Sequence, residues 1–332
     1  MTTIARRSTI IVLVFSVLFS GCNLPVSPAN TTPAGNPRPA QTENVNPTSY
    51  VPATISPGTT ETVPTNETPA QPAPSQTVAP TSTPLVSLSP DTPYAVILIN
   101  KGEVLNVRET AGPTKTVIDR LQAHARKIIL TGKQAMVGKN RWVEIKLSDG
   151  RTGWVNMNYL TAYIPPASFC SDDQVTTLLA SFKNAILKKD GKLLASLVSP
   201  LHGLNVQYLR GGNVVKYTPE LAQWLFTSTY AADWGLQPAS GLAVKGSFHE
   251  EVLPRLVDVL DSSYTSTCNQ PVTGGATYTY AWPYEYTAIN FYSLYRPGPA
   301  GQELDWRTWL VGVEYINGKP FLFSLVHLFW EP

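Results

Sequence analysis

The sequence predicts a multidomain chain in which a small all-β barrel precedes an α+β domain with an antiparallel sheet. Three observations lead to this prediction. A Pro/Thr-rich stretch ends near residue 94, five short strand patterns then follow within about seventy residues, and the remainder shows helical periodicity before further strand patterns. Short strands packed closely in the sequence indicate a barrel, and helices followed by a run of strands indicate an α+β domain.

The first residues have the pattern of an export signal. Two arginines precede an apolar run over residues 10–19, and small residues then lead to Cys22. The apolar run is too short to cross a hydrocarbon core of ~30 Å comfortably, so it is typical of a signal peptide and not of a spanning helix.

Residues 18–22, Leu-Phe-Ser-Gly-Cys, resemble a bacterial lipobox, with Phe19 where such signals usually have Leu. The resemblance implies a signal peptide over residues 1–21 and lipidation of Cys22. The resemblance therefore also implies a lipid-anchored protein on the extracytoplasmic face of the cell membrane. In a two-membrane cell the anchoring membrane could be the outer membrane. Two or three acyl chains anchor stably, because each buried methylene contributes ~0.8 kcal/mol. An ordinary secretory signal with an incidental cysteine is the alternative.

Residues 22–93 have the composition of a disordered tether. More than half of the chain's 29 prolines lie here, mixed with Thr, Ser, Asn and Gln, and Tyr50 is the only aromatic residue. Such a segment buries too little apolar area to offset the entropy lost on ordering. The net charge of +2 argues against a nucleic-acid partner, which would require a strongly basic face.

Residues 94–163 carry the strand patterns of the predicted barrel. Apolar and polar residues alternate over 105–108, 141–147 and 152–155, and Ser-Asp-Gly-Arg at 148–151 is a hairpin turn signal.

Four pieces of this segment fall in the order and spacing of a bacterial SH3 (SH3b) domain. They are Leu-Asn-Val-Arg at 105–108, Trp-Val-Glu-Ile at 142–145, Asp-Gly-Arg-Thr-Gly-Trp-Val at 149–155, and Tyr-Leu at 159–160. The resemblance implies an SH3-like barrel over 94–163 that acts as a targeting module. Several members of that family bind peptidoglycan, and the modules are not catalytic themselves.

Five residues are candidates for ligand binding by this module: Asn106, Arg108, Trp142, Trp154 and Tyr159. The first two flank an apolar strand residue, so they should share the outward face. Polar side chains beside aromatic rings suit amide-rich, sugar-linked peptides. The alternatives are that the tryptophans belong to the core and that the arginine pairs with a neighbouring acid.

Residues 167–332 predict the α+β domain. Ser171 to Gln174 form a capping-box pattern, and apolar residues recur at helical spacing over 175–187. Strand patterns follow over 288–294, 308–316 and 321–329. A helix pair before a curved sheet loosely resembles NTF2-like or cystatin-like domains, which implies a cone-shaped interior used for a small ligand or only for packing.

Cys170 and Cys268 remain after Cys22 is assigned to lipid. An exported pair is most simply a disulfide, although two separate buried thiols are the alternative. The four histidines are scattered with no short-spaced pair, so the sequence predicts no metal site, no cofactor and no enzyme.

The predicted function is a lipid-anchored envelope protein whose SH3b module binds or senses peptidoglycan or another wall ligand. One alternative is small-molecule or carbohydrate binding by the C-terminal domain, with the barrel as a spacer. Ten aromatic residues between Tyr278 and Trp309 would form either the binding platform or the core of that domain. A role beside a wall hydrolase is the third interpretation.

Overall fold

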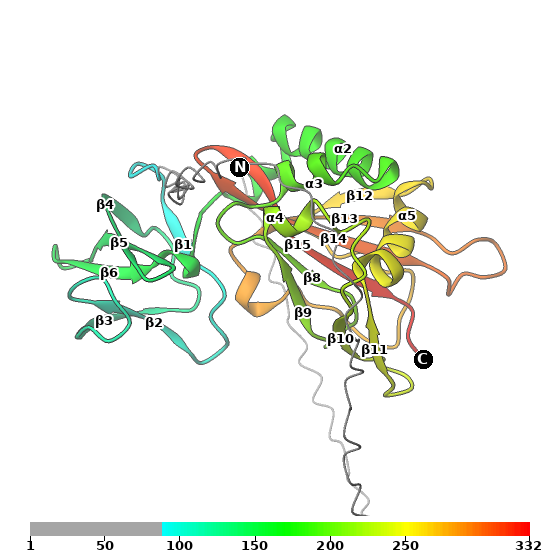
Figure 1. The fold of residues 1–332 in the computed structure, drawn as a ribbon, viewed down its shortest axis with the longest axis horizontal. Coiled ribbons are helices and arrows are strands. Elements are labelled where there is room, and N and C mark those ends of the chain that lie inside the picture. Colours follow the sequence, from blue (N-terminus) through cyan, green and yellow to red (C-terminus); the bar gives the residue numbers. More distant parts are fainter. Residues whose placement is uncertain (1–87) are drawn as a thin grey trace, which may run out of the picture. The chain divides into compact units, whose positions relative to one another are not determined.

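The computed structural model describes residues 88–332, which belong to one compact unit (Figure 1). The predicted signal peptide, Cys22 and the predicted tether up to residue 87 lie outside the described residues. The described chain is mostly β-sheet, arranged in several sheets with few helices. None of its helices has the length and apolar character needed to cross a membrane.

Residues 94–163 contain a five-stranded antiparallel sheet in the order β3-β2-β6-β5-β4. Its strands are β2 (Val104–Arg108), β3 (Val117–Gln122), β4 (Ile129–Val137), β5 (Asn140–Lys146) and β6 (Thr152–Asn156). The short strands β1 (Tyr94–Val96) and β7 (Leu160–Ala162) pair with each other, and the 3-10 turn η1 (Met157–Tyr159) connects β6 to β7. Alternate residues such as Val107, Val143 and Val155 are buried, as the period of two predicts.

The helices of the C-terminal part start directly after this segment. They are α1 (Pro166–Cys170), α2 (Asp173–Lys188), α3 (Gly191–Leu197), α4 (Pro219–Ala222) and α5 (Leu253–Leu260), with a π-turn η2 (Phe248–Val252) leading into α5. The α2 helix begins one residue later than the predicted capping box, because Asp172 and not Ser171 is its N-cap and accepts from Gln174 N at 2.9 Å. It ends where Lys189 adopts a left-handed conformation, φ 55°.

A six-stranded sheet in the order β12-β13-β14-β15-β8-β9 forms the centre of the C-terminal part. Its strands are β8 (Leu204–Gln207), β9 (Val214–Tyr217), β12 (Thr265–Cys268), β13 (Asn290–Arg296), β14 (Arg307–Ile316) and β15 (Lys319–Phe329). The antiparallel prediction is wrong for one pair, since β15 and β8 run parallel. A separate hairpin of β10 (Ala232–Leu236) and β11 (Ala243–Gly246) lies between these elements in the sequence.

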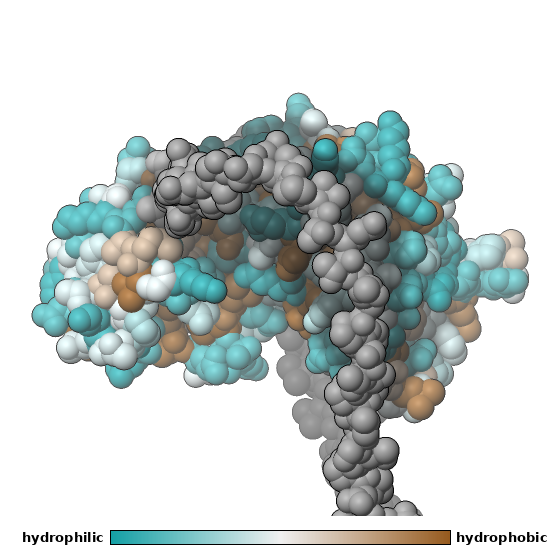
Figure 2. Space-filling view, in the orientation of Figure 1, coloured by the Kyte–Doolittle hydropathy of each residue, from teal (hydrophilic) through white to brown (hydrophobic). Residues whose placement is uncertain are grey.

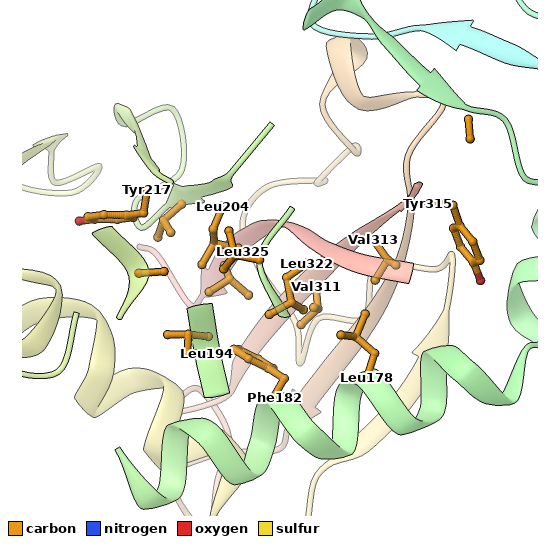
Figure 3. Close-up of a cluster of buried hydrophobic side chains, with 14 of the residues drawn as sticks. Leu178, Phe182, Leu194, Leu204, Tyr217, Val311, Val313, Tyr315, Leu322 and Leu325 are labelled. Atoms are coloured by element: carbon orange, nitrogen blue, oxygen red, sulfur yellow. The ribbon is translucent and has the colours of Figure 1, made fainter. Parts of the chain in front are cut away.

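The helices cover one face of the six-stranded sheet. Figure 3 shows Leu178 and Phe182 of α2 pointing toward Val311, Val313 and Leu322 of the sheet. Phe182 is fully buried, and Val175, Leu178, Ala185 and Ile186 on the same face of α2 are buried too. Burying a side chain of this size stabilises the fold by roughly 1.5–3 kcal/mol, so this apolar stripe explains why α2 lies on the sheet.

An aromatic segment over residues 269–289 covers the opposite face. Trp282 stacks on Phe291 with ring centroids 4.2 Å apart, and its Nε1 donates to Tyr286 O at 2.8 Å. Trp306 is 1 % exposed and donates to Gly275 O at 2.7 Å. All ten aromatic residues between Tyr278 and Trp309 are buried or half-buried. Most of the run therefore forms a second apolar layer and not an exposed platform, while Trp309 packs on the helix-covered face of the sheet.

Where Figure 2 shows the described residues uncovered, hydrophobic residues form separate patches among hydrophilic ones. The residues Trp224, Tyr230 and Leu242 are more than half exposed, but scattered exposed apolar residues of this kind are normal in folded proteins.

Residues 94–163 pack directly on the C-terminal part. Ala95 and Ile97 share an apolar cluster with Tyr286 and Phe323, and Leu98 N donates to Glu285 O at 2.8 Å. Thr161 Oγ1 in β7 also donates to a buried carboxylate oxygen, Glu314 Oε2, at 3.4 Å. Apolar packing and hydrogen bonds thus both join the two segments.

Cys170 and Cys268 form a disulfide, as the sequence predicts, with a sequence separation of 98 residues. The bond links the end of α1 to the end of the edge strand β12. Neither sulfur is free to act as a nucleophile or a metal ligand.

Removing this disulfide should destabilise the chain. Chain-entropy arguments give a closed loop of this length about 4–5 kcal/mol of stabilisation. The free energy of unfolding of a Cys170→Ser, Cys268→Ser double variant should therefore be lower than that of the wild type by about this amount. Urea unfolding, with and without reductant, measures the change. Reductant should lower the stability of the wild-type chain and leave the double variant unaffected. Equal unfolding midpoints for both proteins would contradict the structural role.

Candidate functional site

A cavity of about 540 Å³ opens on the outward face of the five-stranded sheet. Four of the five predicted binding residues line it, namely Asn106, Arg108, Trp142 and Tyr159. We call this cavity the β2 groove. Its remaining lining residues are Ile99, Glu103, Val104, Leu105, Pro113 and Asn156.

Strand alternation places the polar residues of β2 in the groove. Leu105 and Val107 are buried at 5 % and 0 % exposure, while the residues on either side of Val107 are half-buried. Asn106 and Arg108 therefore share the outward face, as the sequence predicts. The Asn106 side chain makes no hydrogen bond to any described residue, so both its donor and its acceptor groups remain for a ligand.

Arg108 is held by the backbone and not by an acid. Its Nη1 donates to Lys115 O at 2.5 Å, and it forms no ion pair with a carboxylate within residues 88–332. Glu144 lies on β5, which is separated from β2 by β6. Its carboxylate accepts a hydrogen bond from Thr131 and forms an ion pair with Lys133, whose Nζ lies 3.1 Å from Glu144 Oε2. One carbonyl contact orients the guanidinium and leaves further N–H donors for a ligand.

Trp142 is buried in the wall of the groove and not in the main core. It is 5 % exposed, yet it does not belong to the apolar clusters that the core residues form. Its indole Nε1 is buried with no hydrogen-bond partner among the described residues. Leaving a buried N–H unpaired costs roughly 1–3 kcal/mol, so this donor is able to bind a water molecule or a ligand group in the groove.

Trp154 lies on the same sheet face but does not line the groove. It pairs with Arg108 on one side and with Glu144 on the other in the β-ladder, and its ring is half-buried. The sequence did not indicate the other six lining residues as binding residues, and Glu103 and Asn156 are the polar ones among them. Strand alternation could have indicated Asn156, because residues two positions apart on a strand share a face and Asn156 lies two residues after Trp154. It also lies directly opposite Trp142 in the β-ladder.

The groove combines a guanidinium, a carboxylate, two side-chain amides and two aromatic rings. Its volume is within the range of small-molecule and peptide sites, and its polar groups are few and convergent. Such an arrangement can bind a short polar chain that carries amides and charges of both signs. It contains no pair of a nucleophile and a base.

Comparison of the chain with protein-family models, curated proteins and solved structures returns no match.

The four histidines stay apart in the structure, and no group of three or more His, Cys, Asp or Glu side chains in the described part of the chain could hold a metal ion. His124 and His249 are exposed, whereas His202 and His327 are buried. His202 Nδ1 lies 2.7 Å from Glu314 Oε2, and both side chains are closed off from solvent. This buried pair supports the structure and cannot reach a substrate.

His327 is buried as a neutral imidazole. Its pKa falls from 6.5 to about 3, chiefly because burial disfavours the charged ring, and Arg307 and Arg255 lower it further. A hydrogen bond from Nδ1 to Tyr208 O, at 3.2 Å, opposes this shift without cancelling it.

This burial predicts acid sensitivity of the fold. The unfolded chain binds a proton at His327 below pH 6.5 and the folded chain does not until about pH 3, so stability falls as the pH drops through that window. The loss is about 1.4 kcal/mol per pH unit at most. A His327→Phe variant lacks this proton uptake, so its urea stability should decline less between pH 6.5 and pH 4.5. Parallel pH profiles for the two proteins would contradict the prediction.

Proposed function

We propose that the chain is a lipid-anchored envelope protein whose segment 94–163 is an SH3-like barrel that binds peptidoglycan peptides in the β2 groove. The single observation that carries this proposal is the convergence of Asn106, Arg108, Trp142 and Tyr159 on one cavity of about 540 Å³. Those residues come from three separate places in the sequence, and the resemblance to SH3b domains had indicated all four.

Strand topology supports the barrel. Tyr94 in β1 pairs with Ala162 in β7 and also bridges to Ile128, the residue before β4. The β1 strand thus contacts both the chain just before β4, at one edge of the five-stranded sheet, and β7, which follows β6. These contacts partly close the sheet on itself, as in a barrel.

The chemistry of the groove matches a stem peptide of the wall. Such a peptide carries backbone amides together with free carboxylate and amino groups. Arg108 suits a carboxylate, because a guanidinium forms paired, charge-assisted hydrogen bonds to it. Glu103 suits an amino group, and Asn106 can pair with an amide as both donor and acceptor. Tyr159 and Trp142 offer aromatic surface to apolar parts of the ligand.

Binding, and not catalysis, is the activity that we propose. Both cysteines of the described residues are joined in the disulfide, which removes the thiolate that a cysteine hydrolase would need. Export and lipidation at Cys22 would hold the module at the membrane surface, and residues 22–93 would set its reach into the wall.

Substitution of Arg108 should weaken wall binding. An Arg108→Ala variant loses a charge-assisted bond worth roughly 1.5–3 kcal/mol, so retention on purified cell wall should fall at least about tenfold. Arg151→Ala is the matched control, because Arg151 lies in the β5–β6 turn, is 55 % exposed and does not line the groove. Wild-type retention by a folded Arg108→Ala protein, verified by circular dichroism, would remove the β2 groove from the proposal.

Substitution of Cys22 should release the protein from the membrane. A Cys22→Ala variant lacks the sulfur that accepts the lipid, so it should leave the membrane fraction and carry no fatty acid. Cell fractionation with mass spectrometry of the N-terminal peptide measures both properties. An unmodified Cys22 in the wild-type protein, or an uncleaved precursor in the cytosol, would contradict the anchoring proposal.

A further inference from the structure

Two charged residues of opposite sign lie at the two ends of the strand that carries the β2 groove. Glu103 directly precedes β2, and Arg108 is its last residue. They are the only charged residues among the described residues that line the groove. A strand rises about 3.3 Å per residue, so their Cα atoms lie roughly 17 Å apart. A ligand that contacts both side chains therefore carries a cationic and an anionic group at separate positions.

The turn before β2 orients the carboxylate of Glu103. Its Oε2 accepts from Asn100 N at 3.3 Å and from Asn100 Nδ2 at 3.0 Å, while Glu103 N donates to Asn100 O at 3.0 Å. Gly102 permits this turn, because its φ of 87° is a conformation that side chains with a Cβ rarely adopt. Glu103 is exposed, and its Oε1 makes no hydrogen bond to a described residue, so this oxygen is accessible to a ligand.

Neither charge is neutralised within the described part of the chain. Glu103 accepts from neutral amide groups, Arg108 donates to the neutral carbonyl oxygen of Lys115, and neither side chain forms an ion pair there. The charged residues close to them in the sequence are exposed and do not line the groove, namely Lys101, Glu109 and Lys115. Neutral contacts thus hold two opposite charges in position, which prepares the groove for a ligand with the complementary charges.

The other polar groups of the lining suit a peptide backbone. Asn106 lies on β2 between the two charges, and its side-chain amide has no partner among the described residues. Asn156 Oδ1 accepts from Asn158 N at 3.0 Å, which leaves its two N–H donors for a ligand. Side-chain amides pair with backbone N–H and C=O groups. The lining as a whole therefore fits a short peptide that carries one free amino group and one free carboxylate.

We propose that the β2 groove distinguishes wall peptides that are not cross-linked from those that are. This inference rests on the proposed function, because it takes a stem peptide of the wall as the ligand. Cross-linking bonds the side-chain amino group of one stem to a carbonyl carbon of another, whose terminal residue leaves as a free amino acid. The first stem loses its positive charge, and the second loses its terminal carboxylate. Neither product can then contact both Glu103 and Arg108 with complementary charges.

Calorimetry of the full chain with three N-acetylated stem pentapeptides, of sequence L-Ala–γ-D-Glu–L-Lys–D-Ala–D-Ala, tests this proposal. The first peptide keeps the lysine amino group and the terminal carboxylate. The second has an acetylated lysine, as in a cross-linked stem, and the third ends in a carboxamide. Each change removes one charge-assisted contact, so the second and third peptides should bind the wild type at least about tenfold more weakly than the first.

Two variants assign each selection to one residue. Glu103→Gln removes the charge of an exposed residue but keeps an oxygen for Asn100, so the first and second peptides should bind it equally while the third stays weaker. Arg108→Ala should show the converse pattern, with equal binding of the first and third peptides. Glu109→Gln is the matched control, since this carboxylate is exposed, follows β2 and does not line the groove, and it should discriminate as the wild type does.

The possible failures are distinguishable. If none of the three peptides binds the folded wild type, the proposed function is wrong, and this inference falls with it. Equal affinity for all three peptides would leave wall binding intact and overturn the selection. Discrimination against the acetylated lysine that persists in Glu103→Gln would overturn the role of that carboxylate.

Discussion

Burial of both faces of the β14–β15 pair is the constraint on which the C-terminal part depends. On one face, Trp309 and Leu325 pack beneath the helices and are fully buried. On the other, Leu310 and Val326 lie under the aromatic segment 269–289 and are equally closed off. A strand pair covered on both faces offers no flat surface to a partner, so access remains only at its ends.

The five-stranded sheet of residues 94–163 is organised differently. Its inner face contributes Val107, Val143 and Val155 to the core, while its outward face carries polar residues around the β2 groove. This contrast explains why two segments of one compact unit offer different chemistry. The groove presents charged and amide groups on an open sheet face, whereas β14 and β15 are covered on both faces.

Local patterns in the sequence predict much of this structure. The 3.6-residue spacing over 175–187 predicts α2, and the alternation around the turn at Gly150 predicts the β5–β6 hairpin. The same alternation predicts that Asn106 and Arg108 share a face, because strand parity depends only on neighbouring residues. The sequence resemblance also indicates Tyr159, and the predicted disulfide follows from the count of cysteines.

Long-range packing decides what the sequence leaves open. Trp142 and Trp154 have the same pattern, yet only Trp142 lines the groove. The parallel pairing of β15 with β8 joins residues more than one hundred positions apart, and no local signal specifies it. From the sequence alone the aromatic residues could form a platform or a core, with the core favoured, and the packing of residues 269–289 on the sheet decides for the core. His327 appears in sequence only as one polar position in an apolar strand.

Amide hydrogen exchange followed by mass spectrometry tests the central claim, that β14 and β15 are closed on both faces while the outward face of β2 is open to ligand. We expect the slowest exchange in β14 and β15, at rates set by global unfolding. A soluble wall peptide should slow exchange in residues 104–108 and 156–159 and leave β14 and β15 unchanged. Fast exchange in β14 and β15, or ligand protection confined to them, would contradict the account.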